Sequence, residues 1–585
     1  MILVFGGTTE GRKAVEVLEQ AAKPYFYSTR GDEQKVTLLH GQRLIGTMTA
    51  QEVSAFCRSH AICLIIDAAH PFAEELHRNL MEVINQLHLP LIRYDRINPP
   101  HTPDITWCHD YTDAIAQLEA QGIQHLLALT GVQTIGRLKP FWQRHECWFR
   151  ILDRDSSRHI ASQVNFPDSH LVYYDSDNTA SLITQLHPDA ILTKESGLSG
   201  GFTEKVEAAK AAGIKIFVVE RPVYSILAPN SLQSTVTGPH GLRRIIERLL
   251  PDFFPLRSGL TTGTCATAAV QAAMLSLLGE EEESVWVQLP DGESVMVDIE
   301  HVAPGEATVI KDFSDDPDVT RGSRITAHVT YSSAPGCGIR FLQGEGVGKV
   351  TLPGLGIPVG EPAINPVPRQ MMISCVRALT SADIDITISV ENGRELAKKT
   401  FNERVGVVDG ISIIGTSGIV SPLSNEAFIQ SIGRELEVAR AIGCTAIGLA
   451  SGKKGEEALR QRESQLRVIH YGNFIGAALQ RASELGFKHV VLGIMIGKAV
   501  KLAEGHLDTH SHKVSMNSAF LMEVAREADI PDADKLLNGI KMARELWSIM
   551  LPAFFEALRQ HCLEHCRRVF TTGTIEIEII KDNTI

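Results

Sequence analysis

The stretch MILVFGGTTEGRKAVEVLE, residues 1–19, places an apolar strand, a glycine-threonine turn and an amphipathic helix at the start of the chain. A second opening of this kind is LRSGLTTGTCATAAVQAAM, residues 256–274, where a threonine-glycine loop runs into a helix of small residues. It follows an α/β unit that ends near Pro251. The chain therefore starts over at Leu256, and we predict two enzymes joined in one polypeptide.

Length and composition agree with this division. The 585 residues suggest about three or four domains at ~150 residues each. No apolar run approaches the ~20 residues of a membrane-spanning helix, and the N-terminus lacks a signal-peptide pattern. The ten scattered cysteines fit reduced thiols rather than disulfides. We expect a cytoplasmic protein.

The charge balance narrows the class of partner. Asp and Glu number 69 against 56 Lys and Arg, which gives a formal charge of -13. General nucleic-acid binding needs a basic face, so we expect no nucleic-acid partner, and no membrane partner either. A small polyanionic ligand is compatible if cations gather locally. We predict a small-molecule substrate and leave a homo-oligomer open.

The first half alternates strand and helix patterns. Apolar runs such as CLIIDAA (63–69) and AILTKES (190–196) are separated by helical segments, and the polar stretch NPPHTPD (98–104) divides the series in two. Such alternation is typical of parallel sheets covered by helices. We predict two Rossmann-like α/β lobes, residues 1–98 and 99–250, with a cleft between them.

Ligands of open α/β sheets bind beyond the carboxyl ends of the strands. The first strand is followed by the turn Gly6, Gly7, Thr8 and Thr9, and Gly11 completes a spacing close to the dinucleotide fingerprint, with Thr8 in place of the middle glycine. Glu10 is awkward for a pyrophosphate because a carboxylate already occupies the first helical turn. Cofactor binding by this turn and a merely structural helix cap both stay open.

Other strand ends supply further candidates. Asp67 and His70 end a buried strand, with Pro71 opening the next helix, although His70 could simply cap that helix. The TKESGLSGG segment (193–201) offers Lys194, Ser196 and Gly197 as a second cofactor-binding loop. We predict that Asp67 and His70 bind substrate because they end a strand at the cleft. Arg93 and Arg96 are predicted to bind substrate because guanidinium groups suit carboxylates.

The blocks GGTTEG, DAAHPFA, LTG (129–131), TKESG and VVERP together resemble the precorrin-6A reductase family of cobalamin biosynthesis. The resemblance covers about the whole of residues 1–250. It implies reduction of one double bond of a corrin precursor by NADH or NADPH, within two Rossmann-like lobes. Hydride transfer belongs to the cofactor, so we expect no conspicuous acid-base residue. The substrate would be a macrocycle fringed with carboxylates.

The second half, residues 256–585, has a different texture. It contains a hairpin around Asp291-Gly292 and a long glycine-proline tract at 344–370, and then returns to strand-helix alternation. Long ordered loops tend to be functional. We predict an α+β or α/β unit of one or two subdomains that lacks the usual GxGxG loop, with Lys349 of the tract as a substrate contact.

Four polar clusters invite a chemical interpretation. VIKDFSDDPDVTRG (309–322) could be a hard-metal site, but a substrate loop fits better because the calcium-loop spacing is absent. SGKKGEE (451–457) lacks the GKS/T ending of a phosphate loop. HCLEHC (561–566) has zinc-compatible spacing, yet a helix with buried thiols gives the same letters. GHLDTHSHK (505–513), with His506, Asp508, His510 and His512, is either a substrate site or polar surface. We predict no metal site.

LTTGTCATAA, VIKDFSDDPDVTRG, the glycine-proline tract, ISIIGTSGIVSPLS and IGKAVKLAEGHLDTHS resemble the cobalt-precorrin-5B C1-methyltransferase family. The resemblance implies S-adenosylmethionine as methyl donor to a ring carbon. Methyl transfer needs chiefly aligned reactants in a dry pocket. Met495 stands where the family pattern suggests a histidine. The residues predicted for this half are catalytic Asp312, His506 and Asp508, donor-binding Gly415, Thr416 and Gly418, and substrate-binding Thr261, Thr262 and Thr264.

The two resemblances are to consecutive steps, since C1 methylation yields the compound that the reductase then reduces. Tethering raises the local concentration of the second catalyst near the released intermediate, so channelling is a hypothesis. Three alternatives stay open. One half could be an inactive scaffold, the chain could be a tetrapyrrole carrier, or the first half could be an unrelated Rossmann oxidoreductase.

Overall fold

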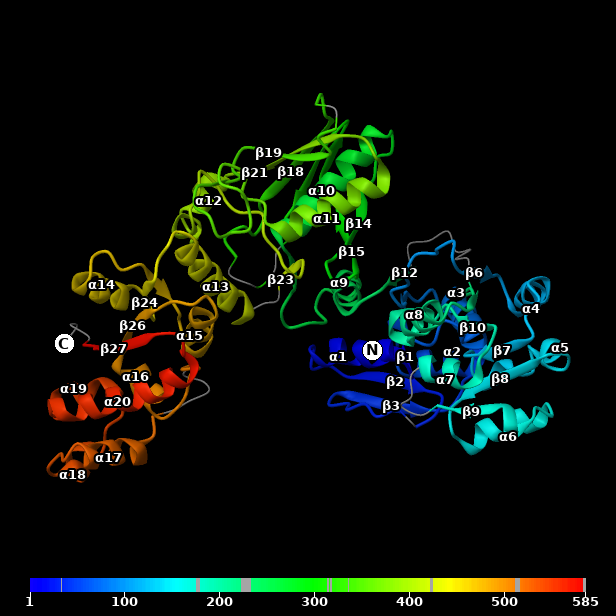
Figure 1. The fold of residues 1–585 in the computed structure, drawn as a ribbon, viewed down its shortest axis with the longest axis horizontal. Helices are drawn as coiled ribbons and strands as arrows, with labels where there is room; N and C mark the ends of the chain where they lie inside the picture. The colour runs from blue at the N-terminus through cyan, green and yellow to red at the C-terminus, as the bar shows by residue number, and fades with distance from the viewer. Residues whose placement is uncertain are drawn as a thin grey trace. The chain divides into compact units, whose positions relative to one another are not determined.

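The computed structural model describes residues 1–32, 34–174, 179–222, 233–312, 315, 318–334, 336–420, 425–510 and 516–581. The chain divides into two compact units, coloured blue to green and green to red in Figure 1. The first unit comprises Met1–Pro255 and Asp291–Met296, and the second comprises Leu256–Pro290 and Val297–Ile585. The boundary at Leu256 lies where the sequence predicts the restart, but Asp291–Met296, which the sequence places in the second half, clusters with the first unit.

The first lobe of the first unit is a six-stranded parallel sheet. Its strand order is β3 (Gly41–Ile45), β2 (Tyr25–Thr29), β1 (Ile2–Phe5), β4 (Leu64–Asp67), β5 (Leu91–Tyr94), β12 (Gln233–Val236). Alternate residues of β1 enter two separate cores, Ile2 and Val4 on one face and Leu3 and Phe5 on the other. Helices supply both cores, which explains why the strand reads as a continuous apolar run. They are α1 (Thr9–Glu19), α9 (Pro239–Leu249), α2 (Ala50–Ser59) and α3 (Glu74–Leu87).

The second lobe repeats this plan. Its parallel strands lie in the order β9 (Leu171–Tyr173), β8 (Glu146–Ile151), β7 (His125–Ala128), β10 (Ala190–Lys194), β11 (Lys215–Val219), β6 (Thr106–Cys108). The helices are α4 (Tyr111–Ala120), α5 (Lys139–Trp142), α6 (Asp155–Gln163), α7 (Thr179–Leu186) and α8 (Phe202–Ala212). The prediction of parallel α/β lobes is confirmed. The lobe boundary differs, because β12 and α9 return to the first lobe although the sequence placed them in the second.

The second unit begins with an α+β region. Its five-stranded sheet runs β16 (His301–Ala303), β17 (Glu306–Ile310), β18 (Arg324–Tyr331), β21 (Ile384–Val390), β19 (Ile339–Gln343), with only the β19–β21 pair parallel. The small-residue helix α10 (Thr262–Leu277) packs on β17 and β18 and against α11 (Pro366–Leu379) (Figure 1). Alanines and threonines make this close packing possible, and 13 residues of α10 are buried. Short strands complete the region: β13 (Gly259–Leu260), β14 (Ser284–Gln288), β15 (Ser294–Asp298), β20 (Lys349–Val350), β22 (Val407–Val408) and β23 (Ile419–Val420).

The rest of the second unit is a parallel four-stranded sheet, in the order β25 (Val468–His470), β24 (Ala446–Ala450), β26 (His489–Met495), β27 (Thr574–Ile580). Its helices are α13 (Asn425–Ala441), α14 (Lys453–Arg462), α15 (Ile475–Glu484), α16 (Ile496–Ala503), α17 (Ser518–Glu527), α18 (Ala533–Leu537), α19 (Leu546–Ile549) and α20 (Pro552–Val569), with α12 (Gly393–Ala397) preceding them. None of the helices described is both long and apolar enough to cross a membrane.

Candidate active sites

Both sheets of the first unit have a topological switch point, the place where chain connections leave a central strand pair in opposite directions. The pairs are β1 with β4 and β7 with β10. Ligands of open α/β sheets bind just beyond such carboxyl ends. Hydrogen bonds bring the segments that follow these strands together, although they are up to 189 residues apart in the sequence.

The GGTTEG turn is held by hydrogen bonds and by packing against Tyr27, and free space lies beside Gly7. Thr8 caps α1 by accepting the Gly11 N–H, and its hydroxyl donates to the Ala68 carbonyl at 2.7 Å. The Tyr27 ring fills the space beside Gly6, where a Cβ would overlap it. Gly7 has φ +94° and no atom within 4 Å of a Cβ position. Thr8 therefore has a structural role in capping α1 and holding the turn, and Gly7 leaves room for a ligand. The cofactor roles of Gly6, Gly7, Thr8 and Thr9 stay predictions.

Asp67 is buried at the end of β4. Its carboxylate lies 2.7 Å from His77 Nδ1, 2.7 Å from Arg93 Nη1 and 3.1 Å from the Ala69 N–H. Burial opposes ionisation, but the His77 hydrogen bond and the Arg93 charge lower the pKa of Asp67. Asp67 thus orders the 67–73 turn, and Arg93 keeps part of its guanidinium exposed beside it.

A second buried ion pair joins the two lobes. Glu10 accepts from Arg96 Nε at 3.0 Å and from the Ser199 hydroxyl, and Arg96 Nη1 donates to the Ser196 carbonyl at 2.7 Å. Burial raises the pKa of Glu10, but the Ser199 hydrogen bond and Arg96 outweigh it and lower the pKa. Glu10, whose carboxylate is unsuited to a pyrophosphate, is therefore paired with Arg96 inside the protein. Arg96 is only 7% exposed, and its substrate contact stays a prediction.

His70 lies within a cationic cluster, which we define as Arg93, Arg96, Lys194 and Lys205. Burial and the charges of all four residues lower the pKa of His70 to about 3, so its imidazole is neutral. Nδ1 accepts the Phe72 N–H at 3.2 Å. Lys194, at the end of β10, places Nζ 5.0 Å from the centre of the Phe72 ring. The cluster fits an anionic ligand.

Two residues of this arrangement were not predicted from the sequence. Lys205 lies within α8 and donates to the Gly200 carbonyl at 3.0 Å, but a lysine in a helix looks like any solvated charge. Tyr27 accepts the Gly7 N–H at 3.0 Å and donates to Gln34 at 2.5 Å. The VVERP block also joins in, because the Arg221 N–H donates to Glu195, next to Lys194. The sequence had already placed this block at a strand end and among the blocks that carry the reductase resemblance.

In the second unit, the loop before α10 binds the GTSG turn. Thr264 donates to the Gly418 carbonyl at 2.7 Å, Thr262 accepts the Ile414 N–H at 2.9 Å, and Thr261 caps α10. A Cβ at Gly415 would overlap Thr261. The Thr261 side chain occupies the space beside Gly415, one of the residues predicted to bind the methyl donor. Donor binding by Gly415, Thr416 and Gly418 stays a prediction, as does substrate binding by the threonines.

Asp312 lies beside this loop pair and accepts the Leu260 N–H at 2.9 Å. Its neighbour Lys311 is buried and pairs with Asp318 at 2.6 Å, so Lys311 and Asp318 stabilise the segment instead of binding a metal. Asp316 lies outside the described residues. Within the described part of the chain, no three His, Cys, Asp or Glu side chains converge as metal ligands.

His506 and Asp508 follow α16, in a different part of the unit. Phe474 and Asp508 form an isolated bridge, and the Thr509 N–H donates to the Asn473 carbonyl at 3.0 Å, so this loop lies against the segment that follows β25. His506 is half-exposed near Glu504. His512 lies outside the described residues. Lys349 is an exposed residue of β20 paired with Val408.

The two remaining motifs have structural explanations. The buried Glu456 of SGKKGEE contacts Arg404 at 2.6 Å, His470 at 2.7 Å and Arg460 at 2.8 Å, so it belongs to an ion-pair cluster. In HCLEHC, Cys562 and Cys566 are fully buried in α20, as the helix interpretation expected.

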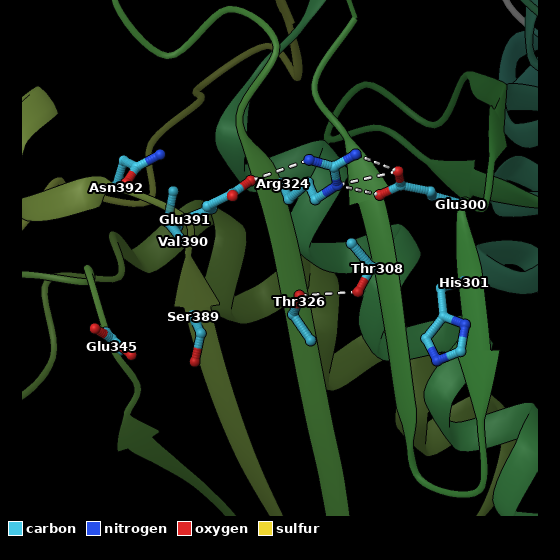
Figure 2. Close-up of a pocket in the computed structure, with 10 residues that line it drawn as sticks. All are labelled: Glu300, His301, Thr308, Arg324, Thr326, Glu345, Ser389, Val390, Glu391 and Asn392. Atoms are coloured by element: carbon cyan, nitrogen blue, oxygen red, sulfur yellow. Dashed lines mark hydrogen bonds and ion pairs between the residues drawn. The ribbon is translucent and has the colours of Figure 1, made fainter.

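A shallow cavity of about 730 Å³ lies on the face of the five-stranded sheet away from Ile325 and Ala327 (Figure 2). Figure 2 shows Arg324 between Glu300 and Glu391, with the Thr308–Thr326 hydrogen bond below. Glu345 adds a third carboxylate to the lining. Because Arg324 is already paired and carboxylates are in excess, this cavity disfavours a polycarboxylate ligand.

Residues 1–238 match the family described as precorrin-6x reductase CbiJ/CobK, and residues 251–422 match the family described as CbiD. The chain is 41% identical over 345 residues to the cobalt-precorrin-5B C(1)-methyltransferase of Prosthecochloris aestuarii. The matched region covers 56% of this chain and 94% of that protein. Among solved structures, the cobalamin biosynthesis protein CbiD of Archaeoglobus fulgidus is 30% identical, covers 46% of this chain and 84% of its own, and gives a TM-score of 0.25. A CobK precorrin-6A reductase is 19% identical, covers 43% and 97%, and gives a TM-score of 0.35.

Proposed function

Because the chain belongs to the cobalt-precorrin-5B C1-methyltransferase family and carries a precorrin-6x reductase region ahead of it, we propose that it catalyses two consecutive steps of corrin synthesis. The second unit transfers a methyl group from S-adenosylmethionine to C1 of cobalt-precorrin-5B. The first unit reduces the resulting macrocycle with NADPH. Cytoplasmic location, a homo-oligomer and channelling between the units stay predictions.

The observation that carries the reductase assignment is the cationic cluster at the two switch points. The macrocycle is fringed with carboxylates and NADPH carries phosphates, so both need the positive charge of Arg93, Lys194 and Lys205. The open space beside Gly7 gives a ligand access to the first turn. NADPH, when bound, supplies a hydride. The neutral imidazole of His70 offers a hydrogen bond without adding further charge.

For the methyl donor we favour the carboxyl ends of β24 and β26. Successive strands leave this pair in opposite directions, which makes it a switch point. A Cβ at Gly452, just after β24, would have no atom within 4 Å, whereas Gly415 is packed against Thr261. S-adenosylmethionine supplies an electrophilic methyl group, and its cationic sulfonium tolerates a site without a phosphate cradle. Asp312, His506 and Asp508 are the candidate bases, with the threonine loop and Lys349 as substrate contacts.

Calorimetric binding of S-adenosylmethionine tests the donor site. Gly452→Val adds a side chain where the protein has room, so the unit should fold normally but bind the donor at least ~10-fold more weakly, a cost of about 1.4 kcal/mol. Thr416→Val is the matched variant in the GTSG turn and should bind normally. The opposite pattern would assign the donor to Gly415–Gly418.

The function is tested by incubating the purified chain with cobalt-precorrin-5B, S-adenosylmethionine and NADPH, followed by mass spectrometry. The product should gain one methyl group and two hydrogens. A gain of the methyl group alone would identify the first unit as a scaffold. Binding of the macrocycle without any mass change would identify a carrier.

A further inference from the structure

The proposed reduction consumes a proton as well as a hydride. NADPH supplies only the hydride, which adds to one atom of the double bond, and the other atom must receive a proton. No acid for this step was expected from the sequence. If the first unit performs the proposed reduction, one of its residues must supply this proton.

Most polar groups near the two switch points cannot supply this proton. Arg93 and Arg96 do not deprotonate in proteins. His70 is neutral, and because Nδ1 accepts the Phe72 N–H, its single hydrogen is on Nε2. Releasing that hydrogen would create an imidazolate, so His70 can donate a hydrogen bond but not a proton.

The two lysines of the cationic cluster differ in their contacts. Lys205 donates to the Gly200 carbonyl at 3.0 Å and thereby holds the loop before α8. Lys194 lies at the carboxyl end of β10, the strand of the switch point, and its Nζ lies over the Phe72 ring. Within the described ranges, no acceptor is recorded on Lys194 Nζ, so its hydrogens are available to a ligand.

We propose that the Lys194 ammonium donates the proton that completes the reduction. As the hydride adds to one atom of the double bond, the π electron pair moves to the other atom. That atom forms a bond with a hydrogen of Nζ, and the N–H electron pair stays on nitrogen. The macrocycle is reduced by two electrons, NADPH is oxidised by two, and water reprotonates the neutral amine.

The electrostatic setting suits an acid near neutral pH. Burial and the charge of Arg137 lower the pKa of Lys194 to about 8, while Glu74 opposes the shift. The charge of Lys194 also acts on His70 and Lys205, which carry no negative charge. The acid form therefore predominates below pH 8, and the rate of reduction should fall as pH rises through that value.

The test compares Lys194→Arg with wild type in the full chain. Arginine keeps the positive charge but cannot release a proton, so kcat for reduction should fall ~10²–10³-fold with little change in KM. The alkaline limb near pH 8 should also disappear. Lys210→Arg, at an exposed residue of α8 paired with Asp104, is the matched control, and an unchanged urea unfolding curve of the first unit reports that the variant is intact.

A measurement without turnover separates proton donation from simple charge. In NMR of the chain with ¹³C-methylated lysines, the signal missing from Lys194→Arg should titrate near pH 8. Titration near ~10.4, the ordinary lysine value, or full kcat in Lys194→Arg would overturn the proposal. If wild-type chain does not oxidise NADPH with the methylated macrocycle, the reductase function itself fails instead.

Discussion

The glycine-threonine turns that open the two halves look alike in sequence but are built differently. In GGTTEG, one glycine is packed against Tyr27 and the next faces open space, and a buried carboxylate-guanidinium pair joins the turn to the other lobe. In the second half, the threonine loop and GTSG close on each other through neutral hydrogen bonds. The first turn lines a charged site. In the second half, Thr261–Thr264 and Gly415–Gly418 pack against each other, and we call this contact the packed joint.

The difference shows that a glycine in a turn does not by itself mark a ligand site. Gly7 and Gly415 both have positive φ, at +94° and +146°. Open space lies beside Gly7, but the side chain of Thr261 occupies the space beside Gly415. The two sites also differ in charge. The cationic cluster surrounds the first site, whereas the hydrogen bonds between the threonine loop and GTSG join neutral groups.

The largest effect should come from breaking the charged site at Asp67. Asp67→Asn leaves Arg93 without its buried counter-ion, which should lower the unfolding free energy of the first unit by about 3–5 kcal/mol and abolish reduction while methyl transfer continues. Because the folded-state pKa of Asp67 is lowered, its stabilisation is present above the unfolded pKa and is lost as pH falls through the folded value. Urea unfolding measures both effects. Asp104→Asn, an exposed carboxylate, should change nothing, and equal curves for both variants would refute the role of Asp67.

A buried acid in the second unit sharpens the comparison through pH. Burial raises the pKa of Glu435 from 4.5 to about 7, against the charges of Arg404 and Arg467. Between these values Glu435 is ionised only in the unfolded chain, so stability should fall as pH rises through the window, by about 3 kcal/mol. Glu435→Gln should remove this slope in urea unfolding. Glu437→Gln, whose carboxylate pairs with Arg481, should keep it, and parallel curves for wild type and Glu435→Gln would contradict the account.

The link between the lobes can be tested by a double-mutant cycle. Glu10→Gln, Arg96→Met and the double variant should give a coupling energy of about 1–3 kcal/mol, because the two side chains share a buried contact. Unfolding of the first unit is the measurement. A coupling energy near zero would mean that Glu10 and Arg96 act independently.

The smallest effect is expected at the packed joint. Thr264→Val leaves the buried Gly418 carbonyl without its hydroxyl donor, which should cost the second unit about 1–2 kcal/mol. Thr264→Ser keeps the hydroxyl and should stay close to wild type. If both variants lose methyl transfer with unchanged stability, the threonine contacts substrate directly.

Strand periodicity was enough to predict the parallel lobes of the first half. Continuous apolar runs such as ILVF and LIID are buried on both faces, and polar residues at their ends mark the site. The return of β12 was missed because QSTV carries little apolar signal. The partner of Glu10 was missed because Arg96 is 86 residues away, and no local spacing connects them.

In the second half, sequence patterns found the right segments but not their contacts. Thr264 and Gly418 are 154 residues apart, so the packed joint could not be read from either motif alone. Lys205 carried no signal because its role depends on the Gly200 carbonyl. Long-range contacts decide which of several similar motifs meets a ligand, and local pattern does not contain them.

The central claim is that one chain performs two consecutive reactions, and NADPH oxidation tests it most directly. Purified chain supplied with cobalt-precorrin-5B and NADPH should oxidise NADPH only after S-adenosylmethionine is added, since methylation creates the substrate of the reductase. Oxidation before the donor is added, or none after it, would contradict the account.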